Sequence, residues 1–502
     1  MHQTSSRLLR MTEDDRPFTR DFKDLFSTLM VSLPLSTHRL RFKSYPFTFT
    51  SEEAINNLGS LKFSQSNRMP DPKDPSRIVT TTTTTTFSMA KEMARSVCQR
   101  FMDARFIEVA DGKPVPVFPL KGCLWQLTPK GINVLDRFCQ KNGINQEHVL
   151  KLLHSPLNTM KLVILERDVK TDKVSGDKTT VEVIFRRFAG PQPNIKSSVM
   201  VSDNDSLSEY SDGLTGVKMA EVRKIYDKVV KNSFSGKAAV DWLLDCCTTV
   251  ERSETYEILS NFVHYGLIES AFEDRVYIQQ NPKATDFQPT KNAVYVFTER
   301  GKRVAGWIEG APPATDRTLN GEGTNGTTAR GKLEKGSRDT RETNTTRLTA
   351  ILNDPALRLL FREFLREIVC EENLSFYCDV VEFKKTVDNL DTKKPDMVRE
   401  TLASAYGLYN AFLAPGSPCE LNIDSTLRQD MASRMTMAVA KDEDSMYANL
   451  REVANLFERA RAQVFKLMAA DSVPKFIRTA RYMEVAGDIQ DDERQGTRQR
   501  AI

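Results

Sequence analysis

The 502-residue sequence lacks the features of several large protein classes. It contains no run of about 18 or more apolar residues, so the pattern excludes a membrane-spanning helix. The first residues, MHQTSSRLLRMTEDD, contain no apolar core, so we expect no secretory signal there. The five histidines form no HExxH pattern and the eight cysteines form no CxxC pair, so we expect neither a metal nor a cofactor.

The charge balance is also uninformative at first sight. There are 71 basic and 67 acidic residues, a net charge of +4, which is too small to indicate a global polyanion-binding surface. Hydrophobic residues at 40% and charged residues at 27% are typical of globular chains and exclude a wholly disordered one. Reduced, buried thiols in a cytoplasmic protein are the favoured interpretation of the cysteines, with a metal or disulfide site as the alternative.

The length predicts about three domains, and composition shows where the chain divides. Residues 311–346 are rich in glycine, threonine and charge and have almost no large apolar side chain, which is typical of a flexible linker. Three globular blocks are therefore expected at 17–190, 217–310 and 347–485. We expect residues 486–502 to be a disordered tail.

Two stretches of the first block look like additions to it. Residues 69–86 contain PDPKDPS and then seven threonines at 80–86, which give no alternating face and favour an inserted loop. Residues 160–188 contain the β-type runs 162–165 and 181–185 around a Gly-Asp pair, which predicts an extra hairpin.

The first two blocks share a pattern. The segments that begin at Phe49, Arg100 and Trp125 recur, in the same order, at Phe234, Asn261 and Tyr295. In the second block, helices are predicted at 222–230, 238–246 and 255–265, and β-type runs at 276–278 and 293–297. Three helices that lead into a small hairpin are typical of a winged helix.

The second block resembles the DEP domain, a winged-helix module of signalling proteins, through the sequence FSGKAAVDWLL at 234–244. The first block, through the shared pattern, resembles a degenerate fungal form of that module. It lacks the Asp-Trp pair, and Asn56 and Asn57 stand near the places of Asp241 and Trp242. DNA binding is the alternative for a winged helix. The third helix carries Glu254 and Glu257 and no lysine or arginine after Arg252, which disfavours contact with phosphates and any nucleic-acid partner.

The third block has the pattern of an all-α bundle. Asp354 and Pro355 are typical of a helix start, and Glu371 and Glu372 lie at the positive end of the next helix. Further helices are predicted at 397–409, 425–438, 447–468 and from Val473 onward.

This block resembles the regulator of G-protein signalling (RGS) domain. The resemblance rests on EENLSF at 371–376, YNAFL at 409–413, LNIDS at 421–425 and VFKLMAADS at 464–472. The predicted fold class is therefore mainly α, with two DEP-type winged-helix domains (α+β) followed by an all-α RGS bundle. That order resembles the fungal developmental regulators of heterotrimeric G proteins, which restrain vegetative growth and permit asexual sporulation.

The resemblance implies a face that binds a heterotrimeric Gα subunit. Its residues would be Glu372, Asn373, Asn422, Leu467, Asp471, Ser472 and Lys475, with apolar contacts from Ile368, Val369 and Cys370. Taken singly, each polar residue has a local alternative as a turn residue, a cap or a surface acid, and only their joint order favours the functional interpretation. Lys475 stands where arginine is common and Cys370 where serine is common.

The expected function is a GTPase-activating protein that has no catalytic site of its own, because Gα holds the hydrolytic site. A scaffold that binds Gα or a receptor without acceleration is the alternative. The winged-helix blocks are expected to bind a receptor tail or the membrane surface, which would recruit a cytoplasmic protein peripherally to the plasma membrane.

Overall fold

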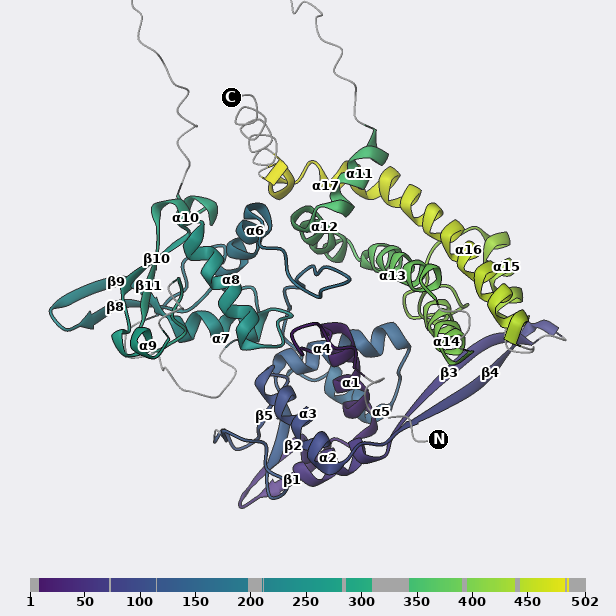
Figure 1. Cartoon of the computed structure of the whole chain (residues 1–502), viewed down its shortest axis with the longest axis horizontal. Helices are drawn as coiled ribbons and strands as arrows, with labels where there is room; N and C mark the ends of the chain where they lie inside the picture. The colour runs from purple at the N-terminus through teal and green to yellow at the C-terminus, as the bar shows by residue number, and fades with distance from the viewer. Residues whose placement is uncertain are drawn as a thin grey trace, which may run out of the picture.

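The computed structural model describes residues 9–71, 74–113, 115–196, 210, 212–281, 286–308, 343–390, 395–437, 443–483 and 485–486. Figure 1 shows a first unit of helices and a small sheet, a second unit of the same kind beside it, and a helical bundle formed by the C-terminal part. Nearly all of the predicted linker and tail lie outside the described residues, but Asn344 already begins a helix.

The first unit has a helix, a β-hairpin, two helices, two further strands and two closing helices. Its elements are α1 (Thr19–Ser32), β1 (Ser36–Leu40), β2 (Lys43–Thr50), α2 (Ser51–Gly59), α3 (Lys91–Asp103), β5 (Ile107–Val109), β6 (Leu124–Leu127), α4 (Pro129–Asn142) and α5 (Glu147–Leu153). The sheet order is β1-β2-β6-β5. Phe22, Phe26, Phe101 and Phe106 form an aromatic cluster in its core.

The second unit repeats this plan. Its elements are α6 (Lys178–Ala189), β7 (Ile195–Lys196), β8 (Met219–Ile225), β9 (Lys228–Ser235), α7 (Gly236–Cys246), α8 (Arg252–His264), β10 (Ile268–Phe272), α9 (Arg275–Gln280), β11 (Val294–Phe297) and α10 (Glu299–Val304). The strands β8-β9-β11-β10 have the same order as β1-β2-β6-β5 in the first unit, with β7 added beside β8. The internal repeat predicted from the sequence is confirmed.

The repeat extends to one close backbone contact in each unit. Thr128 caps α4 by accepting from the Gly131 amide at 3.0 Å, and Thr298 caps α10 by accepting from the Gly301 amide at 2.9 Å. A Cβ on Gly131 would lie 2.1 Å from the Phe106 carbonyl oxygen, and a Cβ on Gly301 would lie 2.0 Å from that of Leu267. Both positions therefore require glycine because of space.

Two predictions in the second unit are wrong. Residues 222–230 were predicted to be helical, but they form the hairpin of β8 and β9, whose valines also fit a strand. Residues 276–278 were predicted to be β-type, but they lie in α9, where the Asp274 carboxylate accepts from the Val276 and Tyr277 amides and starts a helix. Short apolar runs fit both the helical and the strand period, so hydrogen-bond partners decide which element forms.

Both additions to the first block also need correction. The predicted threonine loop is a long two-stranded hairpin of β3 (Leu61–Asp71) and β4 (Asp74–Phe87), and β3 lies against α14 (Pro395–Phe412) and α15 (Ser425–Met437) of the bundle. The predicted hairpin at 160–188 does not form, because its second half is the helix α6.

Helix α6 packs into the core of the second unit. The Phe188 ring lies 5.5 Å from that of Trp242, and the Phe185 ring lies 5.1 Å from that of Phe262. This helix occupies the place that α1 has in the first unit, although the sequence placed it in the first block. We therefore infer that the division between the two winged-helix units precedes Lys178.

The two winged-helix units are joined by buried polar contacts. Arg105 of the first unit pairs with Asp241 of the second at 2.9 Å, and both side chains are more than nine-tenths buried. The Lys130 ammonium donates to the carbonyl oxygens of Leu244 and Thr249 at 2.5 and 2.6 Å. Asp241, one of the residues of the DEP-type motif, thus binds the neighbouring unit.

The third unit is the predicted helical bundle. Its elements are α11 (Asn344–Asn353), α12 (Pro355–Glu367), α13 (Glu371–Asp388), α14, α15, α16 (Glu443–Leu467), a π-helical segment (Met468–Ser472) and α17 (Val473–Phe476). Asp354 accepts from the Leu357 amide at 2.9 Å with Pro355 at the first helical position, which confirms the predicted helix start.

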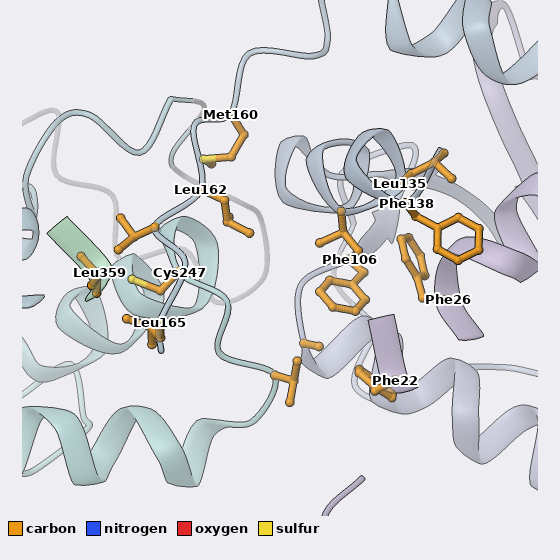
Figure 2. Close-up of a cluster of buried hydrophobic side chains, with 14 of the residues drawn as sticks. Phe22, Phe26, Phe106, Leu135, Phe138, Met160, Leu162, Leu165, Cys247 and Leu359 are labelled. Atoms are coloured by element: carbon orange, nitrogen blue, oxygen red, sulfur yellow. The ribbon is translucent and has the colours of Figure 1, made fainter. Parts of the chain in front are cut away.

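Residues 162–166, which lie between α5 and α6 in the sequence, contact both the second unit and the bundle. Figure 2 shows Leu162 and Leu165 of this segment beside Cys247 at the end of α7 and Leu359 of α12. The Val163 amide donates to the Cys246 carbonyl at 2.8 Å, and the Glu166 carboxylate accepts from Arg358 of α12 at 2.8 Å. The bundle therefore contacts the winged-helix units through both apolar and charged side chains.

Candidate functional site

The turn between α12 and α13 presents the first part of the candidate face. Val369 lies at its tip with φ of 56° and an 85% exposed side chain. A β-branched residue rarely adopts this left-handed conformation, so the surrounding structure must hold the turn. The Cys370 amide donates to the Leu365 carbonyl at 2.8 Å, but Cys370 provides no side-chain cap for α13.

Glu372 and Asn373 lie in the first turn of α13. The Asn373 amide nitrogen donates to the Cys370 carbonyl at 3.3 Å and to a Glu372 carboxylate oxygen at 3.1 Å. Asn373 is buried, and its two hydrogen bonds shape the turn. Burial raises the pKa of Glu372, and the neighbouring carboxylate of Glu371 adds to this rise.

The loop between α14 and α15 presents Asn422. Leu421 and Ile423 on either side are buried, while Asn422 between them is exposed. The alternation fixes the direction of this side chain, which makes no hydrogen bond to the rest of the described chain. Asp424 caps α15 by accepting from the Thr426 amide at 2.9 Å. The local turn role considered for Asn422 therefore belongs to Asp424, two residues further along the chain.

The end of α16 and the π-helical segment present the third part. Asp471 and Lys475 are exposed and pair with each other at 2.7 Å, Leu467 is 38% exposed, and Ser472 is buried. An extra residue in a helical turn changes the direction of the side chains that follow it, and such segments are frequent at functional sites.

Ring packing and a hydrogen bond place these segments near one another. The Phe364 ring of α12, before the turn, lies 5.5 Å from that of Phe476, after the π-helical segment, and the Asp424 amide donates to Gln463 of α16 at 3.0 Å. Burial raises the pKa of Cys370, and the carboxylates of Glu372 and Asp471 raise it further. Burial and the Glu372 carboxylate likewise raise the pKa of Cys419 in the loop that leads to Asn422. The candidate residues therefore gather around one end of the bundle, with Asn373 and Ser472 beneath its surface.

Sequence reasoning did not find the role of Glu371. Its carboxylate turns inward and accepts from Arg366 at 3.1 Å and from Arg137 of the first winged-helix unit at 2.8 Å. Burial alone would raise the pKa of Glu371, but the charge of Arg137 and the other guanidinium groups outweighs burial and lowers it to about 2. No local pattern could indicate a partner that is more than 200 positions away.

The order of two winged-helix units and an RGS-type bundle defines a multidomain regulator of G-protein signalling. Comparisons with protein families give three matches to the chain. Residues 21–155 match the fungal-differentiation regulator winged helix domain, residues 216–297 match the DEP domain, and residues 347–485 match the regulator of G protein signaling domain.

Similar proteins extend this result. The chain is 64% identical to the developmental regulator flbA of Emericella nidulans over 498 residues, which are 98% of this chain and 67% of that protein. It is 28% identical to regulator of G-protein signaling 1 of Schizosaccharomyces pombe over 95% of this chain and 92% of that protein. Regulator of G-protein signaling 7 of Bos taurus is 33% identical over 27% of the chain and 24% of its own length.

The chain belongs to the fungal RGS family that includes this developmental regulator. None of the helices in the described part of the chain combines the length and apolar character needed to cross a lipid bilayer.

Proposed function

We propose that the chain is a GTPase-activating protein for a heterotrimeric Gα subunit and thereby terminates G-protein signalling. The observation that carries the proposal is the exposed Asn422, in the loop whose residues 418–420 line the same cleft as Val369 and Glu372. We further propose that this activity controls the balance between vegetative growth and asexual sporulation, in keeping with the similarity to a developmental regulator.

The proposed mechanism is selective binding of one Gα conformation. Gα holds its catalytic arginine in its own chain, and its hydrolysis is slow because its switch segments and water-orienting glutamine are mobile. A rigid partner that prefers the transition-state conformation by about 2–3 kcal/mol would accelerate hydrolysis roughly 30- to 150-fold. The amide of Asn422 can both donate to and accept from that glutamine.

A single-turnover assay tests this function. Full-length protein added to Gα loaded with GTP is expected to accelerate phosphate release roughly 30- to 150-fold at saturation. Binding to the aluminium-fluoride state of Gα should be tighter than binding to the GDP state, because that state imitates the transition-state charge. Tight binding with an unchanged rate would replace the proposal by the scaffold function.

The two hairpin tips support membrane recruitment. Phe42, at the turn between β1 and β2, is 96% exposed and lies between Arg41 and Lys43. Tyr226, at the turn between β8 and β9, is 88% exposed and lies near Lys228. Exposed aromatic rings beside basic side chains fit the interface of an anionic lipid bilayer. Figure 1 shows both tips at the periphery, away from α15 and α16.

Replacing both Phe42 and Tyr226 with alanine is expected to weaken binding to phosphatidylserine-containing vesicles about tenfold or more, because two inserted rings are lost. Vesicle co-sedimentation measures the effect. Leu157→Ala, which removes another exposed apolar side chain, should leave binding unchanged. Equal binding by the double variant would contradict the proposal, and wild-type binding to a receptor tail but not to vesicles would assign the tips to the receptor.

A further inference from the structure

The first winged-helix unit pairs with one face of α13. Arg137 of α4 binds Glu371 at 2.8 Å, and Lys141, one turn further along α4, binds Asp379 at 2.5 Å. Arg20 of α1 pairs with Asp379 at 3.2 Å and with Glu382 at 2.6 Å. These acids of α13 recur at helical spacing, so they face the same neighbour.

Of these ion pairs between described residues, the one at Glu371 reaches the candidate Gα-binding face. Glu371 is the first residue of α13 and immediately precedes Glu372 and Asn373. The turn before it has an exposed tip in a strained conformation and no side-chain cap at Cys370. Backbone hydrogen bonds within the turn and the contact between Arg366 and Glu371 at 3.1 Å hold the turn to the bundle, while its Val369 tip faces solvent.

The geometry at Glu371 is that of a firm ionic anchor. Both oxygens of its carboxylate accept from the Arg137 guanidinium, at 2.8 and 3.3 Å, and the Glu371 side chain is only 16% exposed. Charge-assisted bonds of this forked kind are among the stronger polar contacts in proteins. Arg366 of α12 also donates to this carboxylate, at 3.1 Å, and Arg362 lies 3.7 Å from it but is held by Glu166 at 2.6 Å. Arg137 is the partner of Glu371 that comes from outside the bundle.

Open space lies next to this ion pair. A cleft of about 660 Å³ lies between α4 and the bundle, and its lining includes Val369 and Glu372 of the turn together with Arg137 and Lys141. The turn thus borders open space next to the ion pair. The ion pair between Arg137 and Glu371 links the start of α13 to α4 beside this space.

We propose that Arg137 is a positioning residue for Gα binding: acting through Glu371, it holds the turn that presents Val369, Glu372 and Asn373. This inference rests on the proposed function as a GTPase activator. The first winged-helix unit then forms part of the structure that presents the Gα-binding face, in addition to any role in recruitment.

Arg137→Ala in the full-length protein is expected to raise the half-saturating concentration in the single-turnover assay about five- to tenfold, because a looser turn weakens binding. The maximal rate should stay unchanged, since the turn makes the same contacts with Gα once Gα is bound. Arg137→Lys should restore most of the affinity, because lysine keeps the charge but loses the fork. In a Glu371→Gln background, Arg137→Ala should have little further effect.

Lys141→Ala is the matched control, because it breaks an ion pair across the same seam from the same helix but ends on Asp379, away from the turn. It should change the half-saturating concentration less than about twofold. Equal effects of Arg137→Ala and Lys141→Ala would show that the contact only holds the first winged-helix unit against the bundle, which would overturn the proposal. An unchanged affinity of Arg137→Ala would overturn it too.

Amide hydrogen exchange separates this inference from the proposed function. In the free protein, Arg137→Ala should speed exchange at residues 369–373 while Lys141→Ala should not. If the wild-type protein fails to accelerate GTP hydrolysis, the proposed function fails, but faster exchange at the turn would still support the positioning role. Unchanged exchange in Arg137→Ala would overturn it whatever the activity.

Discussion

Replacing Asn422 with alanine is expected to reduce the acceleration of GTP hydrolysis roughly 10- to 100-fold, because one contact worth about 1.5–3 kcal/mol in the transition-state complex is lost. The side chain is exposed and makes no hydrogen bond to the rest of the described chain, so the bundle should keep its stability. Single-turnover phosphate release measures the first quantity, and thermal unfolding measures the second.

Asn389→Ala is the matched control for this prediction. Asn389 is also an exposed asparagine of the bundle, but it follows the C-terminal end of α13, about 27 Å along the helix from the turn. Its replacement should leave the acceleration unchanged. If Asn422→Ala accelerates hydrolysis as well as the wild type does, Asn422 is not the residue that acts on Gα, and the proposed mechanism is wrong.

Alanine at Gly131 or at Gly301 is expected to lower the free energy of unfolding of its own winged-helix unit by about 2–4 kcal/mol. The added Cβ would lie 2.1 or 2.0 Å from a backbone carbonyl oxygen. A carbonyl cannot move aside as a flexible side chain can. That of Phe106 accepts from the Thr128 amide at 3.1 Å, and that of Leu267 from the Thr298 amide at 3.2 Å. Urea unfolding followed by circular dichroism measures the loss.

Gly59→Ala provides the comparison for the glycine variants. A Cβ at Gly59, the last residue of α2, would meet only the Met89 carbonyl at 3.8 Å, which is an ordinary contact distance. This variant should stay within about 0.5 kcal/mol of the wild type. Losses at Gly131 or Gly301 no larger than that at Gly59 would show that the close contacts yield without strain.

The sequence predicted the helices of the bundle well, because each carries a long apolar stripe and several have clear starts. Asp354 with Pro355 is a strong local start signal, and the structure places the first residue of α12 there. Predictions failed where the apolar runs were short. The valines at 222–230 fit both helical and strand spacing, and pairing across the hairpin of β8 and β9 makes them strands.

The candidate site was likewise predictable from the sequence only in part. The order of its motifs was visible in the sequence, and so were the three segments that carry Glu372, Asn422 and Asp471. Their meeting at one end of the bundle depends on how α13, α14 and α16 pack, which no local pattern determines. The inward direction of Glu371 was likewise invisible, because the sequence places two identical acids side by side at the helix start.

By itself, the sequence determined that this chain contains a repeated module and a helical bundle with an RGS-type set of motifs. Local periodicity, caps and glycines carry that information, because they act over a few residues. Only the tertiary structure decided that α6 completes the second winged helix and that Arg137 reaches the turn before Glu372. Such contacts join residues far apart in the chain, so they depend on the packing of whole units.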